Sequence, residues 1–105
     1  MSRLLKRLKK WRNNPKDYPP WDSVEATLLS QGFEIDKDSG GSHFQISHEL
    51  LIGEDGYGEF GEFTIAIYKG QTLKAYYLLE IVDAIELVIG LEEEIAKGGD
   101  SDEES

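Results

Sequence analysis

The chain has 105 residues, the length of a single domain with one modest hydrophobic core. It contains no cysteine and only two histidines, His43 and His48, so disulfide frameworks and thiolate metal sites are excluded and a structural zinc site is not expected. No apolar run approaches the ~20 residues of a membrane span, and no secretory signal follows the N-terminus. We therefore expect a cytoplasmic protein with no membrane partner.

Charge is divided into three blocks, although the net charge is −10. Residues 1–16 carry seven basic residues and no acidic residue. Residues 17–90 carry fourteen acidic residues against three lysines, and residues 91–105 carry seven against one lysine. Most of the chain should repel a polyanion, whereas its first segment should attract one.

The first block predicts a short, basic, amphipathic helix over residues 1–16. Leu4, Leu5, Leu8 and Trp11 occur there at helical spacing between basic side chains, before two asparagines and a proline. Three interpretations remain open for this helix. It could dock on the rest of the domain, contact nucleic acid, or bind a membrane surface through its Trp and Leu face.

A second helix is predicted after the rigid connector "DYPP". Asp22 or Ser23 can cap its N-terminus, and Gly32 suits the position just after its C-terminus. Its expected core face comprises Trp21, Val24, Leu28 and, at the edge, Leu29.

Three strands are predicted over residues 33–37, 42–50 and 63–68, because polar and apolar side chains alternate in each. A glycine-containing turn separates the first two. The acidic, glycine-rich segment between the second and third is expected to be a loop, and its carboxylate spacing does not fit a calcium loop. In the second strand, Phe44, Ile46 and His48 should point inward, and His43, Gln45 and Ser47 outward.

The last helix is predicted over residues 73–90, because apolar residues recur there with a helical period. These residues are Tyr77, Ile81, Ala84, Ile85 and Val88. Residues 91–105 are expected to form its acidic end and a disordered tail. Residues 17–90 thus predict an α+β, two-layer domain, with one three-stranded antiparallel sheet covered by helices on one face and open on the other.

His43 would project from the open face, directly after the glycine turn. It could be an ordinary surface histidine. It could also be a metal ligand, although nearby Glu34, Asp36 and Asp38 would give an oxygen-rich site with one nitrogen. A general acid–base role is the third interpretation, since the ordinary pKa of a histidine side chain, about 6.5, allows proton exchange near neutral pH. His48 is expected only to extend the edge of the core.

Four segments of the chain, taken together, resemble the HicA family of small toxins, which are ribosome-independent mRNA interferases. The segments are "LLKRLKKWRNNP", "WDSVEATLLSQGFEI", "SGGSHFQISH" and "FTIAIYKGQTLKAYYLLEIVDAIEL". The similarity covers about residues 3–88. Its most specific parts are the helix ending "LLSQGF", the Gly41-Ser42-His43 element and the "KGQTLKAYY" turn.

The resemblance implies a double-stranded-RNA-binding-domain-like α-β-β-β-α fold preceded by the basic helix. It further implies an endoribonuclease that needs no cofactor, with mRNA as substrate, no DNA binding by the chain itself, and a HicB-like antitoxin protein as partner. His43 matches the catalytic histidine. The positions that match RNA-contacting residues are Gly41, Ser42, Lys69, Gly70, Lys74 and Tyr77.

Such cleavage needs no metal when the neighbouring 2′-hydroxyl is the nucleophile. His43 could remove that proton or protonate the leaving 5′-oxygen, and each role is worth about 10²–10⁴-fold in rate. Lys69 and Lys74 could neutralise the charge that develops on the phosphorus centre. The alternative is a HicA-like chain that has lost its activity and serves as an acidic protein-binding module.

Overall fold

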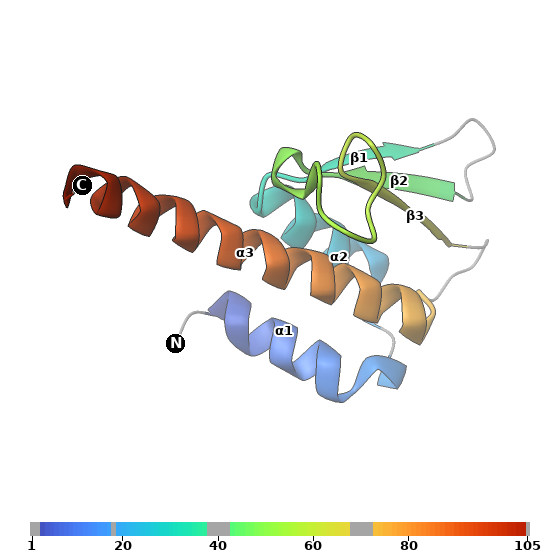
Figure 1. Cartoon of the computed structure of the whole chain (residues 1–105). Helices are drawn as coiled ribbons and strands as arrows, with labels where there is room; N and C mark the ends of the chain where they lie inside the picture. The colour runs from blue at the N-terminus through green and yellow to red at the C-terminus, as the bar shows by residue number, and fades with distance from the viewer. Residues whose placement is uncertain (1–2, 18, 38–42, 68–72, 105) are drawn as a thin grey trace.

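The computed structural model describes residues 3–17, 19–37, 43–67 and 73–104. Figure 1 shows the order of its elements, which confirms the α+β class and the order of helices and strands predicted from the sequence. The elements are α1 (Arg3–Asn13), the short 3-10 helix η1 (Pro15–Asp17), α2 (Trp21–Ser30), β1 (Glu34–Lys37), β2 (His43–Ser47), the 3-10 helix η2 (Glu49–Leu51), β3 (Glu62–Ala66) and α3 (Ala75–Glu104).

The sheet has the order β1-β2-β3, and both pairs of strands are antiparallel. Ile46 pairs with Ile35 on β1 and with Phe63 on β3, and Phe44 pairs with Ile65. Because side chains alternate along a strand, this register brings the apolar residues to one face of the sheet. That face packs on α2 and α3, as expected from the sequence (Figure 1).

Helix α1 adds a third layer that the sequence left open. It lies against α3 on the side away from the sheet (Figure 1), with Leu8 and Trp11 buried. Arg12 forms ion pairs with Asp83 at 2.6 Å and Glu86 at 2.7 Å on α3. The structure therefore shows the docking interpretation. Docking buries Leu8 and Trp11, two of the residues that a membrane surface would need, and leaves Leu5 exposed.

Helix α3 accordingly packs on two sides. Its residues Ile81, Val82, Ala84, Ile85 and Val88 are all fully buried, and they cover more than one helical stripe. A helix that is apolar over so much of its circumference must be covered on more than one side. This explains why one helix of the chain can serve both the sheet and α1.

The predicted N-terminal cap of α2 is wrong, whereas the predicted glycine at its C-terminal end is confirmed. Neither Asp22 nor Ser23 caps the N-terminus, because the helix begins at Trp21, with Pro20 at the cap position and no side-chain hydrogen bond there. At the other end Gly32 has φ +85° and its N–H donates to the carbonyl of Leu29, which confirms it as the residue that ends the helix.

Two further details differ from the expectation. Leu29 is 55% exposed, and Thr27 takes the buried position beside Leu28 instead. Helix α3 continues to Glu104, past Gly98 and Gly99, where the sequence predicted a disordered tail. None of the helices in the described ranges combines the length and the apolar content that a bilayer span requires.

Candidate functional site

A shallow hollow on the open face of the sheet contains His43. It has a volume of about 310 Å³ and is lined by Asp36, His43, Gln45 and Thr64, with one or two residues from each strand. The His43 side chain is exposed, as the alternation of β2 predicted.

The strand register explains why these four side chains meet. Asp36 is paired with Gln45, and Gln45 is paired with Thr64, so the three form one row across the sheet. His43 precedes Gln45 by two residues and therefore projects from the same face. Phe44, between them, turns into the core and fixes the direction of both.

The hollow combines three kinds of chemical group. The His43 imidazole can donate or accept hydrogen bonds, the Asp36 carboxylate is an acceptor, and Gln45 and Thr64 supply neutral hydrogen-bonding groups. The next row of the same face is acidic, since it contains Glu34 and Glu62 at either edge. The hollow therefore holds an imidazole beside a carboxylate, but its lining includes no lysine or arginine that could attract an anionic substrate.

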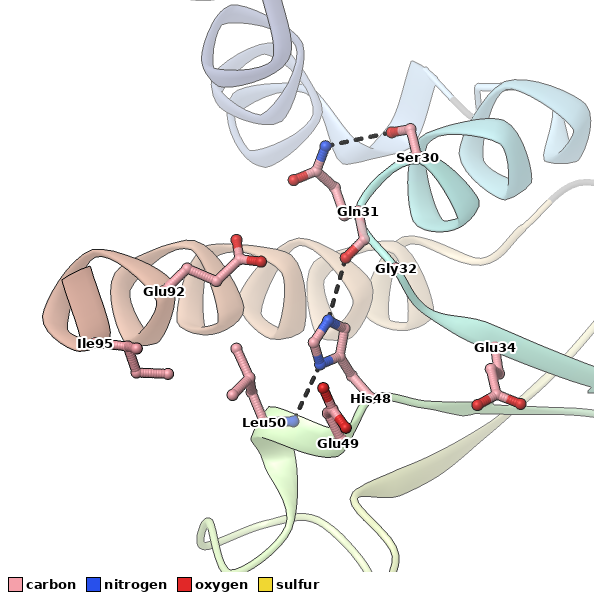
Figure 2. A pocket seen from close by; sticks show the side chains of 9 residues that line it. All are labelled: Ser30, Gln31, Gly32, Glu34, His48, Glu49, Leu50, Glu92 and Ile95. Atoms are coloured by element: carbon pink, nitrogen blue, oxygen red, sulfur yellow. Dashed lines mark hydrogen bonds between the residues drawn. The ribbon is translucent and has the colours of Figure 1, made fainter. Parts of the chain in front are cut away.

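His48 has the opposite environment, as Figure 2 shows. It is 8% exposed, its Nε2 lies 3.1 Å from the carbonyl oxygen of Gln31, and its Nδ1 accepts a hydrogen bond from the N–H of Leu50. Since Nδ1 is the acceptor, Nε2 is the nitrogen that donates to Gln31. His48 thus caps η2 and holds it against the end of α2, and the prediction that it lies at the edge of the core is confirmed.

Lys74 and Tyr77 do not line the hollow. The Lys74 carbonyl accepts hydrogen bonds from the N–H groups of Tyr77 and Leu78, which places Lys74 at the start of α3 with its side chain exposed. Tyr77 is half-buried, and its ring lies 4.4 Å from the ring of Tyr76. Figure 1 shows that α3 begins at the end of the sheet where β2 starts and β3 ends, so Lys74 and His43 share one end of the molecule.

The remaining RNA-contact candidates, Gly41, Ser42, Lys69 and Gly70, lie outside the described residues. Two neighbours of His43 in the hollow were not singled out from the sequence as site residues. Gln45 and Thr64 were recognisable only as polar positions between buried ones, a signal that any half-buried strand gives.

A second hollow, of about 750 Å³, opens beside His48 (Figure 2). Glu34, Glu49 and Glu92 line it together with Ile95, which is 60% exposed. Its histidine is occupied by two backbone partners, and its charged side chains are all acidic. Among the described residues, this hollow therefore has neither an available imidazole nor a cation for phosphate chemistry.

Comparison with known proteins identifies no relative of the chain: no protein-family model, no curated protein and no solved structure matches it.

Proposed function

We propose that the chain is a HicA-like endoribonuclease, an mRNA interferase in which His43 carries a proton during RNA cleavage. The observation that supports this most strongly is the contrast between the two histidines. His43 is exposed in a hollow on the open face of the sheet, whereas His48 is buried at the edge of the core. The order α2-β1-β2-β3-α3, with helices on one sheet face, also suits the proposed double-stranded-RNA-binding-domain-like fold.

The proposed reaction requires two proton transfers and no metal. The 2′-hydroxyl loses its proton to a base as its oxygen bonds to phosphorus, and the bond from phosphorus to the 5′-oxygen breaks as that oxygen gains a proton. The products are a 2′,3′-cyclic phosphate and a free 5′-hydroxyl. His43 serves one of these transfers, which is worth about 10²–10⁴-fold in rate.

Positive charge must come from side chains outside the hollow. Lys74, exposed at the start of α3, is one source, and the N–H groups of that helix's first turn are another. Lys69, Gly70 and the Gly41-Ser42 pair keep the RNA-contact roles that the HicA resemblance gives them. A HicB-like antitoxin would neutralise the enzyme by covering the open sheet face, because His43 lies there.

The test compares the wild-type chain with His43→Ala and His43→Gln for cleavage of a mixed-sequence RNA in excess EDTA. We expect wild-type cleavage and a loss of at least about 100-fold in both variants, since neither side chain can exchange a proton. Ser47→Ala is the matched control, because Ser47 lies on β2 outside the hollow. This variant should cleave like the wild type.

Unchanged cleavage by His43→Ala would contradict the proposal. Equal thermal unfolding midpoints of all variants show that a loss of cleavage does not come from unfolding. Absence of cleavage by the wild-type chain, together with stable binding to a basic protein, would favour the inactive binding module instead. Induced expression of the same variants, scored for growth arrest, gives an independent readout in cells.

A further inference from the structure

A groove of about 570 Å³ lies between α1 and the start of α2. Four basic residues of α1 line one wall, and the opposite wall includes Pro19 and Pro20. The basic residues are Arg3, Lys6, Arg7 and Lys10.

These four cations form one stripe along α1. The first and third of them, and the second and fourth, are four residues apart and lie about one turn from each other, so the four occupy one face over roughly two turns of the helix. Arg7 is held in place, because its Nη1 donates to Thr27 Oγ1 at 2.9 Å. Thr27 is itself buried, and its hydroxyl donates to the Ser23 carbonyl. The groove therefore has one guanidinium held by a hydrogen bond among exposed cations.

No carboxylate lines this groove among the described residues. The ion pairs found in the described ranges both use Arg12, which contacts α3 instead. The positive charge of the stripe is thus retained at the surface, although the chain as a whole carries −10. An anion is the ligand that this arrangement suits.

We propose that this groove binds the phosphodiester backbone of single-stranded RNA, as a second contact for the substrate cleaved at His43. The choice of RNA rests on the proposed nuclease function. A membrane is disfavoured because Leu8 and Trp11, the apolar residues that would insert, are buried against the domain. Four cations on one face of the helix, over about two turns, instead suit a polymer whose negative charges repeat along its length.

The groove also lies where a strand could reach both sites. Trp21, the first residue of α2 and next to the proline wall, has its ring 5.2 Å from that of Phe44, which directly follows His43. The proline end of the groove is therefore at the same end of the molecule as His43 (Figure 1). RNA flanking the scissile bond would pass around this end and continue along α1, where the acidic residues of the sheet face do not repel it.

Binding is tested with the full-length His43→Ala chain, which separates affinity from cleavage, and with fluorescein-labelled oligouridine as the probe. The groove variant Lys6→Gln/Lys10→Gln is compared with Lys9→Gln/Lys16→Gln, which removes the same charge from exposed positions outside the groove. Anisotropy titrations over a range of salt concentrations give the affinity and its salt dependence.

The groove variant should bind about tenfold more weakly and lower the slope of log K against log salt by about 1.4, or roughly 0.7 for each lost phosphate contact. The control pair should change the slope by less than half as much. Equal losses in both pairs, no RNA binding, or equally tight binding of a fluorescein-labelled polyglutamate would overturn the groove proposal. If the chain binds RNA but the wild type does not cleave it, the nuclease proposal fails and the groove proposal stands. If the wild type cleaves RNA but the groove variant binds as tightly as its parent, the groove proposal fails and the nuclease proposal stands.

Discussion

His48 follows His43 by five positions in one extended stretch of chain, and this odd spacing determines the direction in which each side chain points. The backbone of His48 is still extended, with φ −151° and ψ 137°, so the alternation of β2 continues through it. Side chains an odd number of residues apart point to opposite faces of a sheet. One imidazole is therefore presented to solvent and the other to the protein interior.

Two substitutions of His48 measure how much its two hydrogen bonds contribute to the free energy of unfolding. His48→Ala should lower the free energy of unfolding by about 2–3 kcal/mol, since it removes two hydrogen bonds of roughly 1 kcal/mol each and buried ring contacts. His48→Asn should recover about 1 kcal/mol of this loss, because the Asn oxygen can take the place of Nδ1 as acceptor for the Leu50 N–H. Urea denaturation measures both variants. A single hydrogen bond contributes roughly 0.5–1.5 kcal/mol, so a His48→Ala chain whose free energy of unfolding lies within about 0.5 kcal/mol of the wild type would contradict the capping role.

Glu80 on α3 provides a pH-dependent test. Burial, and secondarily the charge of Asp83, raise the pKa of Glu80 above its ordinary value. The folded state therefore binds this proton more tightly than the unfolded state, so the carboxylate lowers stability once the pH rises through the folded pKa, and has no such effect below the unfolded pKa.

Glu80→Gln should accordingly raise the melting temperature at pH 7 and leave it unchanged at low pH, below the ordinary pKa of glutamate. The gain should be under about 1 kcal/mol, because solvent screens a side chain that is only partly buried. Glu86→Gln is the control on the same helix, and should lower stability slightly because Glu86 pairs with Arg12. A stabilisation by Glu80→Gln that is equal at both pH values would show that charge is not its cause.

At the scale of elements, the docking of α1 makes it part of the folded body. Leu8 is 1% exposed and Trp11 is 6% exposed, and both belong to the same hydrophobic core as the sheet. Deleting residues 1–16 would uncover apolar surface on the helices beneath, so it would change stability together with charge. Substitutions of single charges are the cleaner way to study the basic groove.

Trp11→Ala should destabilise the chain by about 3–5 kcal/mol, the usual cost of truncating a buried Trp. Lys9→Ala, an exposed neighbour on the same helix, should change stability by less than about 0.5 kcal/mol. Chemical denaturation of the two variants gives the comparison. Equal stabilities would mean that α1 contributes nothing to the fold in solution.

The elements also show which features of the fold a sequence reveals. Alternation in β2 and β3 predicted which side chains are buried, because a strand with one covered face must alternate. The start of α2 was predicted less well, since a capping side chain is only one of several ways to begin a helix and Pro20 provides another. Docking of α1 was one of three interpretations of its sequence. The sequence could not decide among them, because docking depends on the fit between α1 and surfaces of α2 and α3 that are distant in sequence.

For the whole molecule, the three charge blocks were readable from the sequence, but their positions in space were not. The basic block lies on the layer farthest from the sheet, while the sheet face around His43 contains Glu34, Asp36 and Glu62. The candidate histidine was predictable from a turn and an alternating strand. Its neighbours in the hollow required the register of three strands, which single-strand patterns do not fix.

This separation of charge defines how the proposed nuclease would work as a unit. In this proposal the sheet face would supply the proton carrier, and cations elsewhere would attract phosphate, with Lys74 near one end and the basic groove beside α1. Phosphate neutralisation is the main source of affinity for nucleic acids, so such a division would make activity strongly dependent on salt.

The most direct test of the central claim uses a DNA oligonucleotide that contains a single ribonucleotide, incubated with the chain in EDTA. The account predicts one cleavage, on the 3′ side of that ribose, which leaves a 2′,3′-cyclic phosphate and requires His43. Cleavage of the all-DNA oligonucleotide, or cleavage at the ribose that persists in His43→Ala, would contradict it.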